Sequence, residues 1–405
     1  MRASLVILLA AMGMLGPLGI DMYLPAFPVI GHNFAIEPIG LQLTLTFYLA
    51  CLAAMMLFYG TLSDAFGRRK VLLCSTGLYL VGCLVVVCAH SVDTLLVGRV
   101  LQGLAAGAGG VVGRTVIQDL TSGPATLKAM SQVIMAFSLA PAVAPVMGGW
   151  ILEWLGWRGI FAFQACFAAL LWLWCLLGLP ETLQVDQRQP FHYKTLLKRY
   201  GYIGCDWGFL LPVWAGSFAF LVFSLYIGAA TAFINNLLKL PATAFGWLFI
   251  PLVTGMMLGS ACSARLAGRW TREWQLVIGY TVLIAAGLLN VLHSSLTAPA
   301  LPWSVAPLGI ASFGLALINP CLTLMALDRY PHQRGLAGSL LSFIQTLAFA
   351  GVTGLLAPLV SHSALALALT LLGGSLCSAV CCWAGAQLHS CSLKMNTALN
   401  THKNL

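Results

Sequence analysis

Long apolar stretches recur from one end of this 405-residue chain to the other, and they restrict its fold more than any other feature. Each is long enough for an α-helix, which rises about 1.5 Å per residue, to cross a hydrocarbon core of about 30 Å. Only 8% of the residues are charged, whereas a soluble domain has about 25%. The sequence therefore predicts an all-α membrane protein with twelve transmembrane helices, at residues 4–30, 41–63, 71–89, 94–118, 124–152, 158–180, 207–235, 243–266, 274–293, 302–326, 335–360 and 363–387.

The basic residues are distributed unevenly between the predicted loops. With the amino terminus placed inside, only Arg158 and Lys239 fall on the outer side. This asymmetry follows the positive-inside rule and predicts that both termini are cytoplasmic. The net charge of +9 thus reflects topology in a lipid bilayer, and we expect no nucleic-acid partner. The predicted cytoplasmic segments hold Arg2, Arg68, Arg69, Lys70, Lys128, Arg188, Lys194, Lys198, Arg199, Arg265, Arg269, Arg272, Arg329, Arg334, Lys394 and Lys403.

Thirteen cysteines are scattered along the chain, mostly within the apolar stretches and without a C-x-x-C pair. Such cysteines behave as small apolar residues. We therefore expect neither a disulfide framework nor a zinc site, and no other metal or cofactor.

A polar segment near the middle of the chain separates the predicted spans into two groups of six. Residues 1–183 are predicted to form one six-helix bundle and residues 207–387 a second, with a cytoplasmic linker at 184–206 and a cytoplasmic tail at 388–405. The basic stretch of the linker is expected to lie against anionic lipid headgroups. The two groups retain traces of a repeat, because Gly-Arg follows both the second span (67–68) and the eighth (268–269).

Asp21 is the only charged residue between Arg2 and His32, in the first apolar stretch. A charge at the centre of a bilayer costs at least about 2.5–3.5 kcal/mol on insertion scales, so this carboxylate needs compensation. Arg99 and Arg114 are the only basic residues inside predicted spans, and Arg99 lies at a depth comparable to that of Asp21. The sequence therefore predicts that Asp21 pairs with Arg99, directly or through Gln102.

Two interpretations of this pair remain open. It is either a static ion pair that fixes helix packing, or a site at which Asp21 takes up and releases a proton. Pro17, Gly19 and Pro25 make the first span irregular around Asp21, which favours the second interpretation.

The loop after the second span carries "GTLSDAFGRRK", residues 60–70. Gly60 and Gly67 are expected to allow a tight turn and a close helix approach. Asp64 is expected to accept hydrogen bonds from a helix N-terminus or to pair with Arg68 and Arg69. A plain basic anchor that sets topology explains the arginines but neither the aspartate nor the glycines.

Several motifs resemble those of a known family. Residues 60–70 match the G-x-L-x-D-x-x-G-R-[RK]-[RK] loop of the major facilitator superfamily, and "RVLQG" at 99–103 is similar to its R-x-x-Q-G signature. "APAVAPVMGG" at 140–149 resembles the antiporter motif of span 5, and "IDMYLP", "WRGIF" and "PETL" resemble segments of Bcr/CflA-type drug:proton antiporters. One departure is Gln118 before Asp119, where many relatives carry Arg-Asp.

The resemblance implies a fold of twelve helices in two halves and a mechanism of alternating access. The loop at 60–70 would latch the cytoplasmic ends of the two halves together when the carrier faces outward. The prolines of span 5 would kink that helix, either for packing or for gating. The residues assigned to gating are Gly60, Asp64, Gly67, Arg68, Arg69, Arg114, Asp119, Pro141, Pro145 and Gly149.

The resemblance further implies proton-driven export of small amphipathic compounds across a bacterial inner membrane. We expect the carrier to act as a monomer, powered by the proton motive force. Asp21 and Arg99 would couple the proton. The residues expected to line the substrate cavity are Asp21, Tyr23, Tyr48, Gln102, Phe137, Phe223, Tyr226, Phe233, Asn235, Asn319 and Gln345.

Three other functions are alternatives to multidrug export. Export of one endogenous metabolite or siderophore, and uptake by symport, use the same fold, and the sequence does not separate them. An intramembrane enzyme is disfavoured, since the sequence has no H-E-x-x-H and no G-x-S-x-G.

Overall fold

A computed structural model describes residues 3–122, 124–266 and 269–403, and this part of the chain is helical without β-strands. The first group of spans comprises α1 (Ala3–Asp21), η1 (Leu24–Ala26), α2 (Phe27–Phe34), α3 (Pro38–Met56), α4 (Tyr59–Phe66), α5 (Arg68–Val87), α6 (Val92–Ala106), α7 (Ala108–Leu120) and α8 (Pro124–Gly178). The segment that follows contains η2 (Val185–Gln187) and α9 (Tyr193–Gly204). The rest comprises α10 (Trp207–Ala219), α11 (Leu221–Gly228), η3 (Ala232–Leu237), η4 (Ala242–Phe245), α12 (Gly246–Leu266), α13 (Arg272–Leu296), α14 (Ala306–Leu327), η5 (Pro331–Gln333), α15 (Arg334–Gly351), η6 (Val352–Leu356), α16 (Ala357–Val360) and α17 (Ala364–Lys403).

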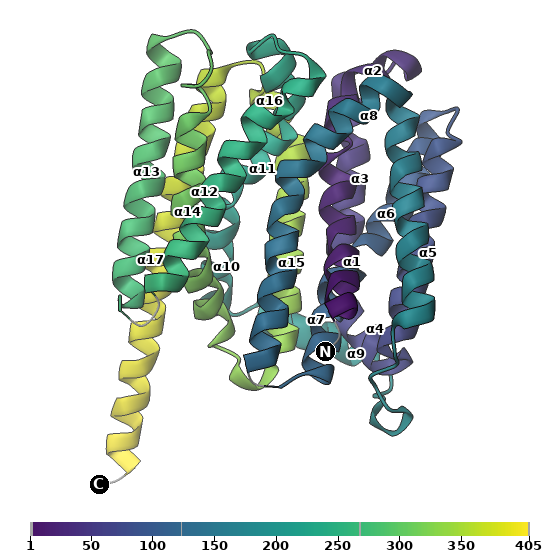
Figure 1. Cartoon of the computed structure of the whole chain (residues 1–405). Helices are drawn as coiled ribbons and strands as arrows, with labels where there is room; N and C mark the ends of the chain where they lie inside the picture. Colours follow the sequence, from purple (N-terminus) through teal and green to yellow (C-terminus); the bar gives the residue numbers. More distant parts are fainter. Residues whose placement is uncertain (1–2, 123, 267–268, 404–405) are drawn as a thin grey trace.

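The long helices run side by side along one axis (Figure 1). We call the end of the bundle where α1 begins the lower end, and the opposite end the upper end, as they stand in that view. Helices α1, α3, α5, α6, α7 and α8 pack mainly on one another, and so do α10, α12, α13, α14 and α17. The two groups meet where α15 and η6 pack on α3 and where α12 packs on α8. The predicted boundaries at 183/184 and 206/207 lie between the end of α8 and the start of α10.

Within the described residues, nine helices are long and apolar enough to cross a membrane, or eleven if two bent pairs each count as one span. The bent pairs are α3 with α4, at an angle of 51°, and α10 with α11, at 45°. Helix α8 covers two predicted spans, and its backbone leaves the helical region only at Gly156, where φ is 71°. The predicted count of twelve therefore stays a prediction, although every predicted stretch overlaps a helix.

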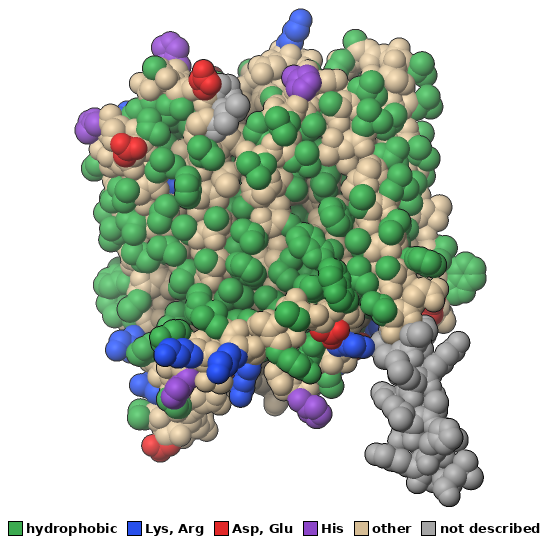
Figure 2. Space-filling model, turned by 180° about the vertical axis from the view of Figure 1, so that it is seen from behind, with side chains coloured by type: hydrophobic (Ala, Val, Ile, Leu, Met, Phe, Trp, Pro, Cys, Tyr) green, Lys and Arg blue, Asp and Glu red, His purple; other side chains and the backbone are tan. Residues whose placement is uncertain are grey.

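The outer surface of the bundle matches a lipid-exposed protein. Figure 2 shows hydrophobic side chains over the whole flank, and Lys and Arg side chains gathered mainly along the lower rim. The lower end is also where α1 begins and where α17 ends (Figure 1). A broad apolar flank between two polar rims is the surface that a bilayer requires.

Candidate functional site

The first span is broken at Asp21, as its prolines predicted. Helix α1 ends at Asp21, the 3-10 turn η1 follows, and α2 starts at Phe27. The Asp21 side chain is only 2% exposed, and its Oδ1 has no hydrogen-bond partner among the described residues. Gly148 of α8 packs directly on this break, because a Cβ at that position would collide with the carbonyl oxygen of Met22. The antiporter-like motif of span 5 therefore contacts the chain beside Asp21.

Arg99 is fully buried on α6 and is held by aromatic rings. Its guanidinium carbon lies 4.2 Å from the centroid of the Tyr48 ring and 4.7 Å from that of Tyr23. Its Nη1 donates to Oε1 of Gln102 at 2.8 Å, whereas Nε and Nη2 have no partner in the described structure. Cation–π contacts of this kind contribute about 2 kcal/mol or more when desolvated.

The expected contact between Asp21 and Arg99 is not formed in this structure. No ion pair joins the two described side chains, and Gln102 does not bridge them, because its Nε2 points to Cys83 and Gln164 instead. The described neighbours of the guanidinium are instead the Tyr23 and Tyr48 rings and the Gln102 amide.

A buried polar chain that the sequence analysis missed continues from this site. Gln164 of α8 is 2% exposed, and its Oε1 accepts from Gln102 at 3.3 Å and from the Tyr79 hydroxyl at 3.1 Å. Its Nε2 donates to the carbonyl oxygen of Leu18 at 3.2 Å. Gly19 makes the arrangement possible, since a Cβ there would collide with the Tyr48 and Tyr79 hydroxyls.

The residues expected to line a substrate cavity are only partly brought together. Tyr23, Tyr48 and Gln102 surround Arg99. Phe137, in contrast, is 41% exposed on α8. The other candidates lie in the second group of spans: Phe223 and Phe233 are buried, Tyr226 accepts a hydrogen bond from Asn290, Asn235 has a buried Oδ1 without a described partner, Asn319 is exposed, and Gln345 is half-buried.

A pocket of about 270 Å³ lies elsewhere, among the lower parts of α3, α4, α5 and α6, and is lined by residues such as Met55, Lys70 and Leu78. It contains none of the residues expected to contact substrate. We therefore place the candidate coupling site at Asp21 and Arg99 rather than in this pocket.

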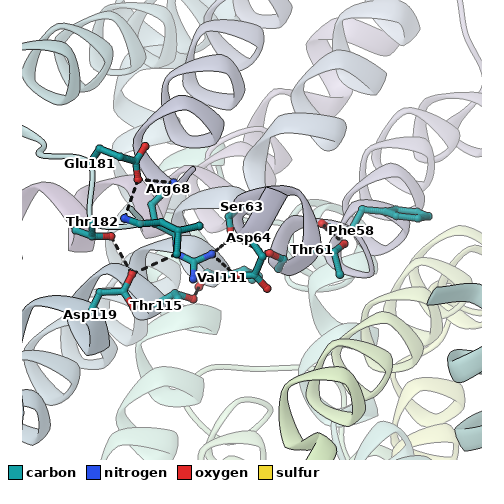
Figure 3. A network of polar contacts seen from close by, with 12 residues as sticks. Phe58, Thr61, Ser63, Asp64, Arg68, Val111, Thr115, Asp119, Glu181 and Thr182 are labelled. Atoms are coloured by element: carbon teal, nitrogen blue, oxygen red, sulfur yellow. Dashed lines mark hydrogen bonds and ion pairs between the residues drawn. The ribbon is translucent and has the colours of Figure 1, made fainter. Parts of the chain in front are cut away.

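A second polar network lies at the lower end, around the loop after the second span (Figure 3). Arg68 pairs with Asp64, as predicted, and its Nε lies 3.3 Å from Oδ2 of Asp119. Glu181 accepts from the backbone N–H of Arg68 at 2.9 Å, and Thr182 donates to Asp119 at 2.8 Å. The Glu181 carboxylate is favourably placed beside the first residue of α5, because a helix N-terminus carries a partial positive charge.

Two expectations about this loop need correction, whereas the turn at Gly67 is found as expected. Gly67 has φ of 98°, so it provides the tight turn. A Cβ at Gly60, however, would meet nothing within 4 Å, so the expected close approach there is wrong. Arg69 donates to the carbonyl oxygen of Leu176 at 2.6 Å rather than pairing with Asp64.

The network does not join the two groups of spans in this structure. Its described bonds stay within the first group, apart from a hydrogen bond from the Gln189 backbone to the carbonyl oxygen of Asp64. The expected latch between the halves is therefore not formed here.

The other residues assigned to gating lie apart from this network. Arg114 is exposed. Helix α8 remains helical through Pro141, Pro145 and the buried Gly149, so neither proline breaks it.

The second group repeats part of the network. Arg272 is the first residue of α13 and lies 3.0 Å from Asp328, just beyond the end of α14. Arg68 and Asp119 stand in the corresponding places on α5 and α7. The position that corresponds to Arg68 is therefore Arg272, three residues after the predicted Arg269. The residue at position 268, predicted to correspond to Gly67, lies outside the described residues.

Hydrogen bonds between the two groups are found at both ends. At the upper end, Nε2 of Gln42 donates to the carbonyl oxygens of Gly228 and Thr353, at 3.0 and 2.7 Å, and Thr231 donates to that of Leu24 at 3.0 Å. At the lower end, the Thr346 hydroxyl of α15 donates to the sulfur of Met56 of α3 at 3.5 Å. The linker also contacts the first group there, because the Tyr200 hydroxyl of α9 donates to the carbonyl oxygen of Leu57 at 2.8 Å.

Comparison with known proteins identifies the family. A model of the Major Facilitator Superfamily matches residues 9–353. A bicyclomycin resistance protein homolog of Haemophilus influenzae is 27% identical, covering 84% of this chain and 85% of the relative. Multidrug resistance protein D of Escherichia coli is 28% identical, covering 94% of this chain and 95% of the relative.

The human organic anion transporter MFSD10 has the same fold, with a TM-score of 0.69 at 20% identity, over 94% of this chain and 100% of that one. With its bundle of apolar helices, the chain therefore belongs to the major facilitator superfamily: it is a multi-pass inner-membrane transporter of the Bcr/CflA type and not an enzyme.

Proposed function

We propose that the protein exports small amphipathic compounds from the bacterial cytoplasm in exchange for protons, by alternating access. The observation that carries this proposal is the buried Asp21 carboxyl at the break in the first span, with one oxygen unpartnered in the described structure. A carboxyl group that meets water in one conformation and not in the other binds its proton differently in the two. Asp21 is therefore our candidate for the proton carrier.

Arg99 supplies the second part of the proposed site. Its Nε and Nη2 are buried without a described partner, so two charged N–H donors are available to an acceptor group. A substrate oxygen, or the ionised Asp21 after a change of conformation, would satisfy them. Substrate and proton would then compete for one site, which is how a carrier exchanges one for the other. The rings of Tyr23 and Tyr48 beside Arg99 suit amphipathic compounds.

The names of the relatives support drugs as the substrate class, since they include bicyclomycin, chloramphenicol and multidrug resistance proteins. The test is growth of a transporter-deficient bacterial strain that expresses this chain, on a panel of amphenicols, sulfonamides, bicyclic and cationic compounds. We expect resistance to at least one class, and its loss in Asp21→Asn at equal expression. Unchanged sensitivity to the whole panel, with a metabolite newly excreted into the medium, would contradict drug export.

We further propose that the lower end, where the basic side chains gather, faces the cytoplasm together with both termini (Figure 2). Cysteines introduced within residues 64–70 and 188–199 should react with membrane-impermeant reagents only in everted vesicles. Labelling of either segment from outside intact cells would contradict this orientation.

A further inference from the structure

The end of α1 is held in place by side chains from three other helices. Tyr48 of α3 donates to the carbonyl oxygen of Gly16 at 2.9 Å, and Tyr79 of α5 lies 3.2 Å from that of Leu15. Gln164 of α8 donates to that of Leu18 at 3.2 Å. Only Leu18 is among the last four carbonyl groups of α1, which a helix does not fully satisfy by itself. The bond from Gln164 therefore falls where α1 stops inside the bundle.

Leu18 is the carbonyl nearest to Asp21 in this set, and its helical bond is long. The backbone N–H of Met22 donates to it at 3.3 Å, so Gln164 shares an acceptor that α1 uses weakly at its end. The amide of Gln164 thus bonds to the turn of α1 that carries Asp21. A change in this bond would act on the backbone three residues before the carboxyl group.

The other end of the same amide leads to Arg99. Oε1 of Gln164 accepts from Nε2 of Gln102, and Oε1 of Gln102 accepts from Nη1 of Arg99. Two buried glutamines therefore connect the guanidinium to the backbone beside Asp21, in a structure where the two charged groups are not themselves bonded. Each glutamine uses its donor and its acceptor at once, which fixes the orientation of the chain.

From this geometry we infer that Gln164 is a positioning residue of the coupling site, which sets the placement of Asp21 relative to Arg99. The inference rests on the proposed proton exchange at Asp21. Gln164 does not titrate; it changes the surroundings in which Asp21 binds its proton. The charged and titratable groups near the site are Arg99 of α6, Tyr23 beside the α1 break, Tyr48 of α3, and Tyr79 and Cys83 of α5. From α8 come two uncharged side chains, Gln164 and Phe161.

The experiment is the pH dependence of proton release when substrate is added to detergent-solubilised protein. The substrate is the most effective compound from the resistance panel. Gln164→Leu removes the amide at nearly constant volume and should move the midpoint of proton release by about one pH unit, a tenfold change in proton affinity. A role in packing alone would lower the amount of folded protein without moving the midpoint.

A matched control lies in the second group of spans. Gln275 of α13 is also buried and donates to Ser263 at 2.7 Å and to the carbonyl oxygen of Leu317 at 2.9 Å. Gln275→Leu should reduce thermal stability but leave the pH midpoint unchanged. Should Gln164→Leu fail to fold, Tyr79→Phe can replace it, because it removes the hydroxyl that donates to Gln164. It should move the pH midpoint of proton release in the same direction by a smaller amount.

The outcomes separate this inference from the proposed function. If the unmodified protein releases protons and folded Gln164→Leu keeps its midpoint, or if Gln275→Leu moves the midpoint equally, the positioning role is wrong and proton exchange stands. If the unmodified protein transports substrate without releasing protons, proton exchange itself is wrong.

Discussion

The side-chain amide of Gln42 lies 2.7 Å from the carbonyl oxygen of Thr353 and thereby joins the two groups of spans at the upper end. The same amide donates to the carbonyl oxygen of Gly228, so one residue of α3 bonds to both η6 and the end of α11. Both acceptors lie where regular α-helix is interrupted: Gly228 is the last residue of α11, and Thr353 is the second residue of η6. Gln42 is therefore placed to keep the upper end closed.

Gln42→Leu should favour opening of the upper end. Loss of two hydrogen bonds of about 0.5–1.5 kcal/mol each would shift the conformational equilibrium roughly 5- to 150-fold. Spin labels at the exposed residues Val29 and Leu359, in a cysteine-free background, would report the separation across this end. We expect a longer distance in Gln42→Leu and no change for Gln187→Leu in the linker. An unaltered distance distribution in Gln42→Leu would show that the closure does not depend on this amide.

Glu181→Gln should destabilise the lower end of the first group. The charged acceptor at the N-terminus of α5 contributes about 0.3–1 kcal/mol by its interaction with the helix dipole, and its loss also weakens the hydrogen bond from the Arg68 backbone. Thermal unfolding followed by tryptophan fluorescence should show a lower midpoint, with a smaller difference at high salt. Glu153→Gln, at an exposed position, is the control and should unfold like the parent.

Asp206 should make stability depend on pH in the acidic range. Burial acts to raise the pKa of this N-cap carboxyl, but hydrogen bonds from Arg329, the Gly208 N–H and Tyr330 outweigh it and hold the pKa below its usual range. The ionised form is therefore the stabilising one. Its contribution is complete above about pH 4, the usual value for aspartate, and is lost as the pH falls through the lowered pKa.

The measurement is the difference in unfolding midpoint between the parent and Asp206→Asn. It should be constant from pH 5 to 8, as long as the carboxylate is ionised, and should shrink below about pH 4. A difference that persists unchanged at the lowest pH reached would mean that the carboxylate charge is not what stabilises this corner.

Arg99→Ala should abolish transport, because it removes the charged donors and leaves the Tyr23 and Tyr48 rings without the cation between them. Arg99→Lys should restore only part of the activity, since an ammonium group has no planar donor fork to bond Gln102 while stacking on the rings. Initial transport rates at equal expression give the comparison. Full activity of the alanine variant would remove Arg99 from the coupling site.

The sequence predicted the charges of the site but not their surroundings. Asp21 and Arg99 stand out because charges are rare in apolar stretches, and Pro17 and Pro25 predicted the break that follows α1. Their mutual contact could not be predicted, because the rotation of each helix about its axis depends on packing. The prediction that they pair rested only on their similar depth in the membrane.

The polar contacts that the sequence analysis missed have a common cause. Gln42 and Gln164 are single uncharged residues within apolar stretches, and both donate to backbone carbonyls. A backbone acceptor leaves no partner residue that a reader of the sequence could match. The loop at 60–70 was easier, because Asp64 and Arg68 are one helical turn apart, yet its bonds to Glu181 and Asp119 come from distant segments.

The most direct test of the account is Asp21→Asn, with proton release on substrate addition measured in detergent and pH-driven uptake measured in everted vesicles. An amide keeps the volume and the hydrogen-bonding capacity of the side chain but does not titrate. Among the described residues no other acidic side chain lies within the middle of a span, so no second carboxyl is present to replace it. We predict that the variant still binds substrate but loses both signals. Accumulation of substrate against its gradient by the asparagine variant would contradict the account, because the proton would then travel by another route.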